Sequence, residues 1–295
     1  MSGFNKIERL GFIRLFMVDQ RDHNSVFVCY GDGVFLQPRD QIVRDAEGLG
    51  IFDAIEVWDR ARLMETPEYR SLDKNIKDHT GSMYFWWKPF IIRKALEDVA
   101  PGGLVFYSDS GRYDGGFRLS TGAKYLIEEF RSSGFTGVLV PQFGSNQQWT
   151  RKECFEQMDC NTSKYRNSPQ IQATFSMWIK SESTMAAITE WENCCRDFNL
   201  VGDVGEDRKQ FQSSSFKAHR HDQSILTLVS LKHQLNYLTL GEELTHQCLK
   251  YLGRVKEVNV EFKKTEFVAE AHATQRVLMP LALKYMRRKL KLQEI

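Results

Sequence analysis

The chain of 295 residues is long enough for one large domain or two small ones, and a chain of this size buries enough surface to fold without disulfide or metal staples. Charged residues make up 26% and hydrophobic residues 42% of the sequence, which are ordinary values for a soluble globular enzyme. The formal net charge of +2 gives no support to a dedicated nucleic-acid-binding protein, because such proteins are usually strongly basic.

The cysteines indicate a reduced, intracellular protein. All six are scattered without a C-x-x-C pair, and the adjacent Cys194 and Cys195 are poorly placed to bind one metal or to bridge to each other. No signal peptide is expected in the first residues, because the apolar segment there is short and interrupted by Arg14. No run of about 18 apolar residues occurs, so the sequence predicts no membrane span and a cytoplasmic location.

The first 110 residues alternate between predicted strands and helices. Strands are expected at 12–19, 25–33, 52–59 and 104–107, and helices at 39–50 and 89–100. Pro89 suits the first position of its helix, since it has no amide hydrogen to leave unpaired there. Pro101, Gly102 and Gly103 are expected to interrupt regular secondary structure between the helix at 89–100 and the strand at 104–107.

The alternation continues with a helix at 120–134 and a strand at 137–143, which predicts an α/β sandwich with a largely parallel sheet. The second half is less regular. Expected there are a short helix near 151–158, an apolar segment at 171–179, a helix from about Ser183 to Phe198 and a polar, candidate mobile loop at 202–218. A basic helix is expected at 278–295, either docked on the core with its charges in solvent or lying on an anionic membrane surface.

The strand at 104–107 is followed by polar residues that end in Gly111. Polar groups at the carboxyl end of a strand lie at the rim of an open α/β sheet, where ligands bind. Asp109 could form an Asx-turn, with Gly111 supplying a positive φ. Alternatively, Asp109 could be a hard oxygen ligand for Mg²⁺ or Mn²⁺, with a diphosphate sharing the ion.

Two further stretches carry candidate chemistry. Four consecutive aromatic residues at 84–87 precede Lys88, which lies next to a predicted helix and is well placed to contact a phosphate. Near 219–226, His219, His221 and Asp222 form a dense set of ligands and bases before another helix, for which Asp222 is a good N-cap. Solvated histidines beside a capped helix are one interpretation. A metallohydrolase is another, although no H-E-x-x-H pattern supports it.

Together, four segments resemble a family of GT-A-type glycosyltransferases found in polysaccharide and glycan biosynthesis clusters. The segments are 81–111, 149–159, 172–178 and 219–226. The family pattern is roughly G-Y-x-x-W-K-P, Y-x-D-x-G, W-T-K-x-D and H-R-x-D-Q-S. The match covers about residues 25 to 235, and its specificity lies in the occurrence of four motifs in the same order at plausible spacing.

The resemblance implies a metal-dependent transfer of a sugar from a nucleotide-diphosphate donor to a hydroxyl of a glycan or other acceptor. Asp109 matches the metal-binding carboxylate, Lys88 the lysine of W-K-P, and Asp222 with Gln223 the Asp-Gln pair near the sugar. Mn²⁺ or Mg²⁺ is the implied ion. The fold implied is a GT-A-like three-layer sandwich with a mainly parallel sheet.

The sequence also departs from the family pattern. Tyr107 stands where many GT-A enzymes have a first aspartate, and Glu153 replaces the aspartate of W-T-K-x-D. The expected organisation is a GT-A-like catalytic domain over 1–245 and a helical extension packed on the core over 246–295. The catalytic domain would have a nucleotide-binding half at about 1–115 and an acceptor half at about 116–245.

In the resulting hypothesis, Tyr30 lies near the base and Gly31 allows close approach of the backbone to the nucleotide. Lys88, Tyr107 and Gly111 complete the donor site. His219 and His221 would be extra metal or phosphate contacts, and the loop at 202–218 would be a lid. Asp222 would deprotonate the acceptor or orient the sugar. The alternatives are a metal-dependent phosphoesterase that uses His219, His221 and Asp222, and a non-catalytic protein that binds nucleotide or glycan.

Overall fold

The structure is a computed structural model that describes residues 23–79, 81–111, 117–119, 123, 127, 131, 137–235 and 237–239. Three expected features lie wholly or mostly outside these residues. They are the strand at 12–19, the helix at 120–134 and the extension at 246–295 with its basic helix.

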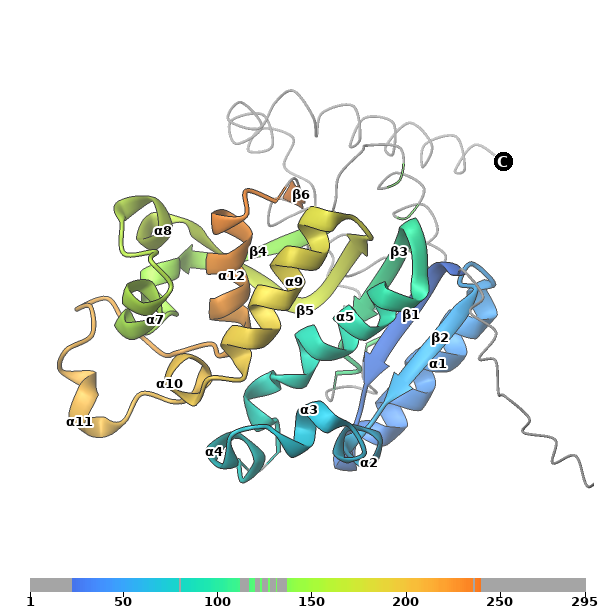
Figure 1. The fold of residues 1–295 in the computed structure, drawn as a ribbon, viewed down its shortest axis with the longest axis horizontal. Helices are drawn as coiled ribbons and strands as arrows, with labels where there is room; N and C mark the ends of the chain where they lie inside the picture. The colour runs from blue at the N-terminus through green and yellow to red at the C-terminus, as the bar shows by residue number, and fades with distance from the viewer. Residues whose placement is uncertain are drawn as a thin grey trace, which may run out of the picture.

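A mixed six-stranded sheet with the order β2-β1-β3-β5-β4-β6 forms the centre of the described chain (Figure 1). Its strands are β1 (His23–Tyr30), β2 (Ala54–Trp58), β3 (Val99–Ser108), β4 (Gly137–Ser145), β5 (Pro169–Ile179) and β6 (Tyr237–Thr239). The sheet runs through both halves of the domain expected over 1–245, because β3 of the first half pairs with β5 of the second.

The expectation of a mainly parallel sheet is wrong. Strand β5 runs antiparallel to both β3 and β4, while β1 is parallel to β2 and β3, and β4 is parallel to β6. The reason is the connection from β4 to β5, which returns to the edge where it left: Ser145 at the end of β4 lies opposite Pro169 at the start of β5. As a result, the carboxyl ends of β1 to β4 lie at one rim.

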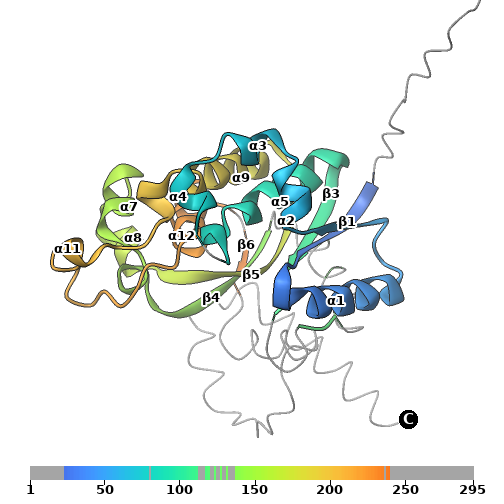
Figure 2. The ribbon, with the colours of Figure 1, turned by 90° about the horizontal axis from the view of Figure 1, so that it is seen from below.

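Helices cover both faces of the sheet. The larger ones are α1 (Leu36–Leu49), α5 (Trp87–Asp98), α9 (Glu182–Cys195) and α12 (Asp222–Lys232). Helices α5, α9 and α12 lie on one face and α1 lies on the other (Figure 2). The buried side chains accordingly divide into two cores, with Val28, Val105 and Tyr107 in the first and Phe27 and Phe106 in the second. This alternation is expected of strands buried on both faces.

Short helices fill the connections. They are α2 (Arg60–Met64), α3 (Pro67–Arg70), α4 (Lys74–Lys77), α7 (Lys152–Gln157), α8 (Ser163–Asn167), α10 (Phe198–Val201) and α11 (Glu206–Lys209), with 3-10 turns η1 (Gly33–Phe35), η2 (Met83–Phe85) and η4 (Asn146–Gln148). Among the helices of the described ranges, none combines the length and the apolar character that crossing a bilayer requires.

Several element boundaries differ from expectation. Strand β3 begins at Val99, so the predicted breaker at 101–103 lies inside it. Val99 pairs with His23 and Leu104 with Ser25, so residues 100–103 form an irregularity that the ladder accommodates. Pro89 is the third residue of α5 rather than the first, which costs no hydrogen bond because the first four helical amides have no intrahelical partner.

The helix expected to reach Phe198 is also divided. Helix α9 ends at Cys195, and Asp197 then accepts a hydrogen bond from the Asn199 amide to cap α10. Asp222 is the first residue of α12, and His221 occupies the cap position without a capping hydrogen bond from its side chain. The carboxylate of Asp222 is therefore available for other contacts.

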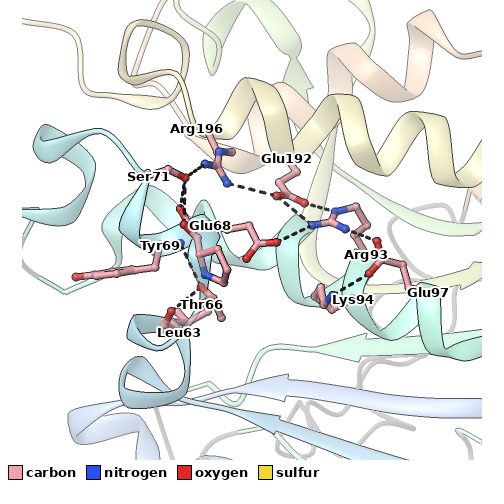
Figure 3. Close-up of polar contacts among 11 residues, drawn as sticks. Leu63, Thr66, Glu68, Tyr69, Ser71, Arg93, Lys94, Glu97, Glu192 and Arg196 are labelled. Carbon is pink, nitrogen blue, oxygen red and sulfur yellow. Dashed lines mark hydrogen bonds and ion pairs between the residues drawn. The ribbon is translucent and has the colours of Figure 1, made fainter. Parts of the chain in front are cut away.

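A network of charged side chains joins α5 to α9 and α3 (Figure 3). Arg93 of α5 donates to Glu192 of α9 at 2.5 Å, pairs with Glu97 one turn further on, and lies 3.8 Å from Glu68 of α3. Arg196 at the end of α9 pairs with Glu192. The side chain of Glu192 is only 6% exposed. Because α5 also carries Lys88 at its first turn, this network fixes the helix that presents Lys88 to the rim.

Candidate functional site

The ammonium of Lys88 lies between two carboxylates at the rim of the sheet. Its Nζ atom is 3.4 Å from Oδ1 of Asp109 and 3.2 Å from Oδ2 of Asp222. The three residues come from the start of α5, the end of β3 and the start of α12. The side chains of Lys88 and Asp222 are each 4% exposed, whereas that of Asp109 is 24% exposed. The three charged motif residues of the sequence thus form one cluster, of which Asp109 is the accessible member.

Tyr107 holds the carboxylate of Asp109. Its hydroxyl donates a hydrogen bond to Oδ1 of Asp109, and the Asp109 amide donates to the Thr174 carbonyl of β5 at 2.8 Å. Tyr107 is fully buried, and burial together with the charge of Asp109 raises the pKa of Tyr107 well above its ordinary value. Tyr107 therefore stays a hydrogen-bond donor at any physiological pH and restricts the orientation of the rim carboxylate.

Asp222 is a buried carboxylate with an unusual proton affinity. Burial raises the pKa of Asp222 to about 6. The positive charge of Lys88 lowers this pKa, but the negative charge of Asp109 raises it and partly cancels the effect of Lys88. Burial also opposes the charge of Lys88, but the two carboxylates outweigh it and raise the pKa of Lys88. Trp191 of α9 donates to the main-chain carbonyl of Asp222 at 2.8 Å and holds the start of α12 in place.

Aromatic rings surround the ammonium of Lys88. Its Nζ lies 5.0 Å from the ring centroid of Phe85, 5.8 Å from that of Trp87 and 5.6 Å from that of Tyr107. Tyr30 at the end of β1 stacks on Trp87 with 3.9 Å between ring centroids. The run of aromatic residues at 84–87 therefore contributes both to the core and to the lining of the site. Trp86 is fully buried in the core, while Phe85 is partly exposed beside the Lys88 ammonium.

The turn before Lys88 is strained. Met83, Tyr84 and Phe85 have φ angles of 49°, 53° and 60°, in the left-handed region that side-chain-bearing residues avoid. His221, directly before Asp222, has φ 51°. Each such residue costs on the order of 1–3 kcal/mol, and such strain concentrates at ligand sites.

Aromatic packing connects the two strained segments. The Tyr84 ring stacks on His79 with 3.9 Å between centroids and lies 5.0 Å from the His221 ring. The Tyr84 hydroxyl is 3.4 Å from Oδ2 of Asp203. The strained residues before Lys88 and before Asp222 therefore support each other. Sequence reasoning missed the roles of Tyr84, His79 and Asp203, because only the fold brings them together.

Tyr30 and Gly31 lie at the expected rim, at the end of β1. Burial raises the pKa of Tyr30, and its hydroxyl is buried without a hydrogen-bond partner among the described residues. A Cβ on Gly31 would lie 2.7 Å from the Phe35 carbonyl and 2.6 Å from Cβ of Arg39. The close approach that requires glycine at 31 is therefore made by the protein itself, which differs from the expected approach of a nucleotide.

Gly111 follows the rim carboxylate in the conformation expected of it. Its φ is +68°, and a Cβ there would lie 2.8 to 3.0 Å from the Phe117 ring. Ser110 donates to the Tyr30 carbonyl at 3.1 Å, which ties the end of β3 to the end of β1. This turn fixes the backbone next to Asp109.

The two histidines are bonded to backbone groups. The Arg151 amide donates to Nδ1 of His219, so Nε2 of His219 carries the proton and donates to the Leu200 carbonyl at 2.8 Å. Burial and the neighbouring charges of His221 and Arg151 lower the pKa of His219 well below its ordinary value. His221 bonds the Val201 carbonyl through Nδ1, and burial lowers its pKa. His219 therefore has no ring nitrogen left for a metal or phosphate, contrary to the expectation.

Gln223 is held against β5. Its Nε2 donates to Gln170 at 2.8 Å, and its Oε1 accepts from the Ala173 amide at 3.3 Å. Gln170 is fully buried and also donates to the Trp149 carbonyl and to Ser224. These contacts make Gln223 a residue that positions α12 on the sheet. No sequence signal pointed to Gln170, because the same strand also contains Gln172, Thr174 and Ser176 and the pattern does not distinguish Gln170 from them.

The predicted loop at 202–218 contains α11 and is anchored by Arg151 and Glu153. Arg151 donates to the Gly202 carbonyl at 3.2 Å, and Glu153 accepts from Arg151 at 3.2 Å and from Gln212 at 3.1 Å. Burial alone would raise the pKa of Glu153, but these hydrogen bonds outweigh it and lower the pKa to about 2. Glu153 therefore holds the loop to α7.

The charges of the cluster fit a cation together with an anionic ligand. When Asp222 is ionised, two carboxylates face one ammonium, so one negative charge is in excess and a diphosphate alone would be repelled. Within the described ranges, no group of three or more His, Cys, Asp or Glu side chains is arranged to hold a metal ion. A divalent ion would therefore depend on Asp109 plus oxygens from a diphosphate and water, which is an ordinary arrangement for Mg²⁺.

Comparison of the chain with models of known protein families gave no match, and comparison with curated proteins gave none either. The inference of function therefore depends on the geometry of the rim and on the motifs that meet there.

Proposed function

We propose that this protein is a metal-dependent glycosyltransferase with a GT-A-like fold, which moves a sugar from a nucleotide-diphosphate donor to a hydroxyl of a glycan or other acceptor. One observation carries the proposal. Lys88, Asp109 and Asp222 belong to three separate motifs of the resemblance, and the fold brings a carboxylate oxygen of Asp109 and one of Asp222 within 3.4 Å of the Lys88 ammonium. Residues that meet only because of the fold, at the rim where α/β sheets bind ligands, are expected of a functional site.

Each residue would have a distinct part. Asp109, oriented by Tyr107, would hold Mn²⁺ or Mg²⁺ at the accessible side of the cluster. When bound, that ion would neutralise charge on the diphosphate as the nucleotide leaves. Lys88 would balance the two carboxylates and stabilise the added negative charge of the donor. Asp222, with its pKa near 6, would accept the proton of the acceptor hydroxyl or orient the sugar.

The alternative of a phosphoesterase receives less support. Both ring nitrogens of His219 bond backbone groups, and the carboxylate of Asp222 pairs with Lys88. A three-ligand site made of His219, His221 and Asp222 would require all of these contacts to break.

A non-catalytic protein that binds nucleotide or glycan on the same scaffold is the remaining alternative. It would show calorimetric binding without transfer.

The deciding experiment is a thermal-shift screen of the full chain against UDP- and GDP-sugars with and without Mn²⁺. A ligand that binds the folded state raises the melting temperature with its occupancy. We expect one donor class to raise it in the presence of Mn²⁺, and Asp109→Ala to remove the Mn²⁺-dependent part. Full activity of Asp109→Ala would contradict the metal role.

The proposal includes a cytoplasmic location in polysaccharide or glycan biosynthesis, with the basic segment 278–295 contacting a membrane surface.

A further inference from the structure

Two cationic side chains lie over one indole ring at the same rim. The Lys217 ammonium is 5.2 Å from the centroid of the Trp149 ring, and the Arg220 guanidinium carbon is 4.4 Å from it. Both cations are exposed, and within the described ranges neither pairs with an acidic side chain. By contrast, Arg151 and Arg208 nearby each pair with Glu153. Trp149, Lys217 and Arg220, here called the basic platform, therefore carry two positive charges without a counter-charge.

The backbone builds the platform. The Lys217 amide donates to the Gln148 carbonyl at 2.8 Å, and the Arg220 amide donates to the Trp149 carbonyl at 3.0 Å. Ser224 at the first turn of α12 donates to the same Trp149 carbonyl and accepts from the Arg220 amide at 3.0 Å. The two cations thus come from a segment that is bonded to the turn carrying the indole, so their approach does not depend on the flexible side chains alone.

The platform lies on the β4 side of the charged cluster, whereas Tyr30 lies on the β1 side. Trp149 follows η4 at the carboxyl end of β4, and β4 is separated from β3 by β5. Arg220 lies two residues before Asp222. Tyr30, by contrast, lies at the end of β1 on the other side of β3. If the donor occupies the β1 and β3 side, as the proposed function has it, the platform faces the second substrate.

We propose that Trp149, Lys217 and Arg220 form an acceptor subsite for a saccharide that carries an anionic group, a phosphate or a carboxylate. An arginine fork and an ammonium recognise these groups through charge-assisted hydrogen bonds. The indole offers a rigid apolar surface against which the C–H groups of a sugar ring pack. This inference rests on the proposed transferase, and it adds the chemical class of the acceptor.

The test is equilibrium binding of glucose 6-phosphate, glucuronate and glucose to the full chain in the presence of UDP and Mn²⁺, followed by tryptophan fluorescence and calorimetry. We expect at least one anionic sugar to bind about tenfold or more tightly than glucose, with an affinity that falls as salt rises. The stronger of the two identifies phosphate or carboxylate as the recognised group.

Variants assign the effect to the platform. Lys217→Gln and Arg220→Gln should each weaken binding of the anionic sugar several-fold and flatten its salt dependence. Trp149→Ala should weaken glucose 6-phosphate while leaving inorganic phosphate unchanged. The matched control is Lys77→Gln, which removes an ammonium 5.6 Å from the Tyr69 ring in the α3–α4 region and should change nothing.

Equal affinity for glucose and both anionic sugars would overturn the inference, as would an equal loss in Lys77→Gln. Inorganic phosphate binding as tightly as glucose 6-phosphate would also overturn it, because the sugar ring would then contribute nothing. UDP and GDP affinities are measured separately. Their absence in the unmodified chain would contradict the transferase itself, whereas intact nucleotide binding with no preference for anionic sugars would contradict only the acceptor class.

Discussion

Lys88 and Asp222 form a buried ion pair with 3.2 Å between Nζ and Oδ2, although Lys88 lies in the first turn of α5 and Asp222 is the first residue of α12. Both side chains are 4% exposed. Removing one partner of a buried ion pair lowers the free energy of unfolding strongly, because the remaining charge is left buried and uncompensated. The pair therefore couples the stability of the rim to the charge state of the candidate site.

Lys88→Met leaves Asp222 buried without its cation. We expect a loss of about 3 to 5 kcal/mol in the free energy of unfolding near neutral pH, the range found when one partner of a buried pair is removed. The loss should shrink in acid, where Asp222 is protonated and no longer needs the ammonium. Urea unfolding near pH 8 and near pH 5 measures both values. Equal losses at the two pH values would contradict the pairing.

Asp222 should also make the unmodified protein lose stability as the pH rises. Its pKa is about 6 in the folded state and lower in the unfolded chain, so between roughly pH 4 and 6 the folded state binds a proton that the unfolded state has released. This contribution is fully present below that window and lost above it, and amounts to at most about 3 kcal/mol. Subtracting the pH profile of Asp222→Asn from that of the unmodified protein isolates it from other carboxyl groups.

Hydrophobic patterning predicted the sheet and its main helices because it reports on burial, and burial is what these elements share. Strands β1, β2, β3 and β4 and helices α1 and α9 all overlap the segments expected to form them, whereas the segment at 171–179 was recognised only as apolar. Hydrophobic patterning could not predict that β5 runs antiparallel to its neighbours. A strand buried on both faces has the same apolar run whichever way it points, and only the pairing of Ser145 with Pro169 reveals that the chain turns back.

Motif reasoning found the charged residues of the site but not their supports. Lys88 and Asp222 stood out because they lie at predicted helix starts, and Asp109 stood out because it follows a buried strand at the rim of the sheet. His219 stood out as part of a dense set of ligands with His221 and Asp222, yet both of its ring nitrogens bond backbone groups that no sequence pattern identifies. Gln170 did not stand out, because a buried glutamine is recognisable only from the partners that the fold supplies.

Tyr107→Phe tests whether the tyrosine hydroxyl orients Asp109. The variant keeps the ring in its buried position and removes the hydrogen bond to the rim carboxylate. We expect Mn²⁺ affinity in the presence of UDP to fall about 10- to 100-fold, as it does when groups that orient a metal ligand are removed. Calorimetric titration of Mn²⁺ measures this. Tyr165→Phe on α8 is the control, and an equal fall in that variant would show that the effect is not specific to Asp109.

Arg93→Met tests whether the network of α5, α9 and α3 supports the site from behind. Among the residues that the structure describes, Glu192 would then retain only Arg196 as an ion-pair partner, at 3.8 Å. We therefore expect a loss of about 3 kcal/mol in the free energy of unfolding, at the low end for a buried pair. Lys94→Met is the matched control, because Lys94 pairs with Glu97 at the surface and exposed pairs contribute about 1 kcal/mol or less. Both variants keep Lys88. If α5 carries the effect to the rim, Arg93→Met should weaken UDP–Mn²⁺ binding even well below its melting temperature. Unchanged binding in a destabilised Arg93→Met would limit the network to holding the fold together.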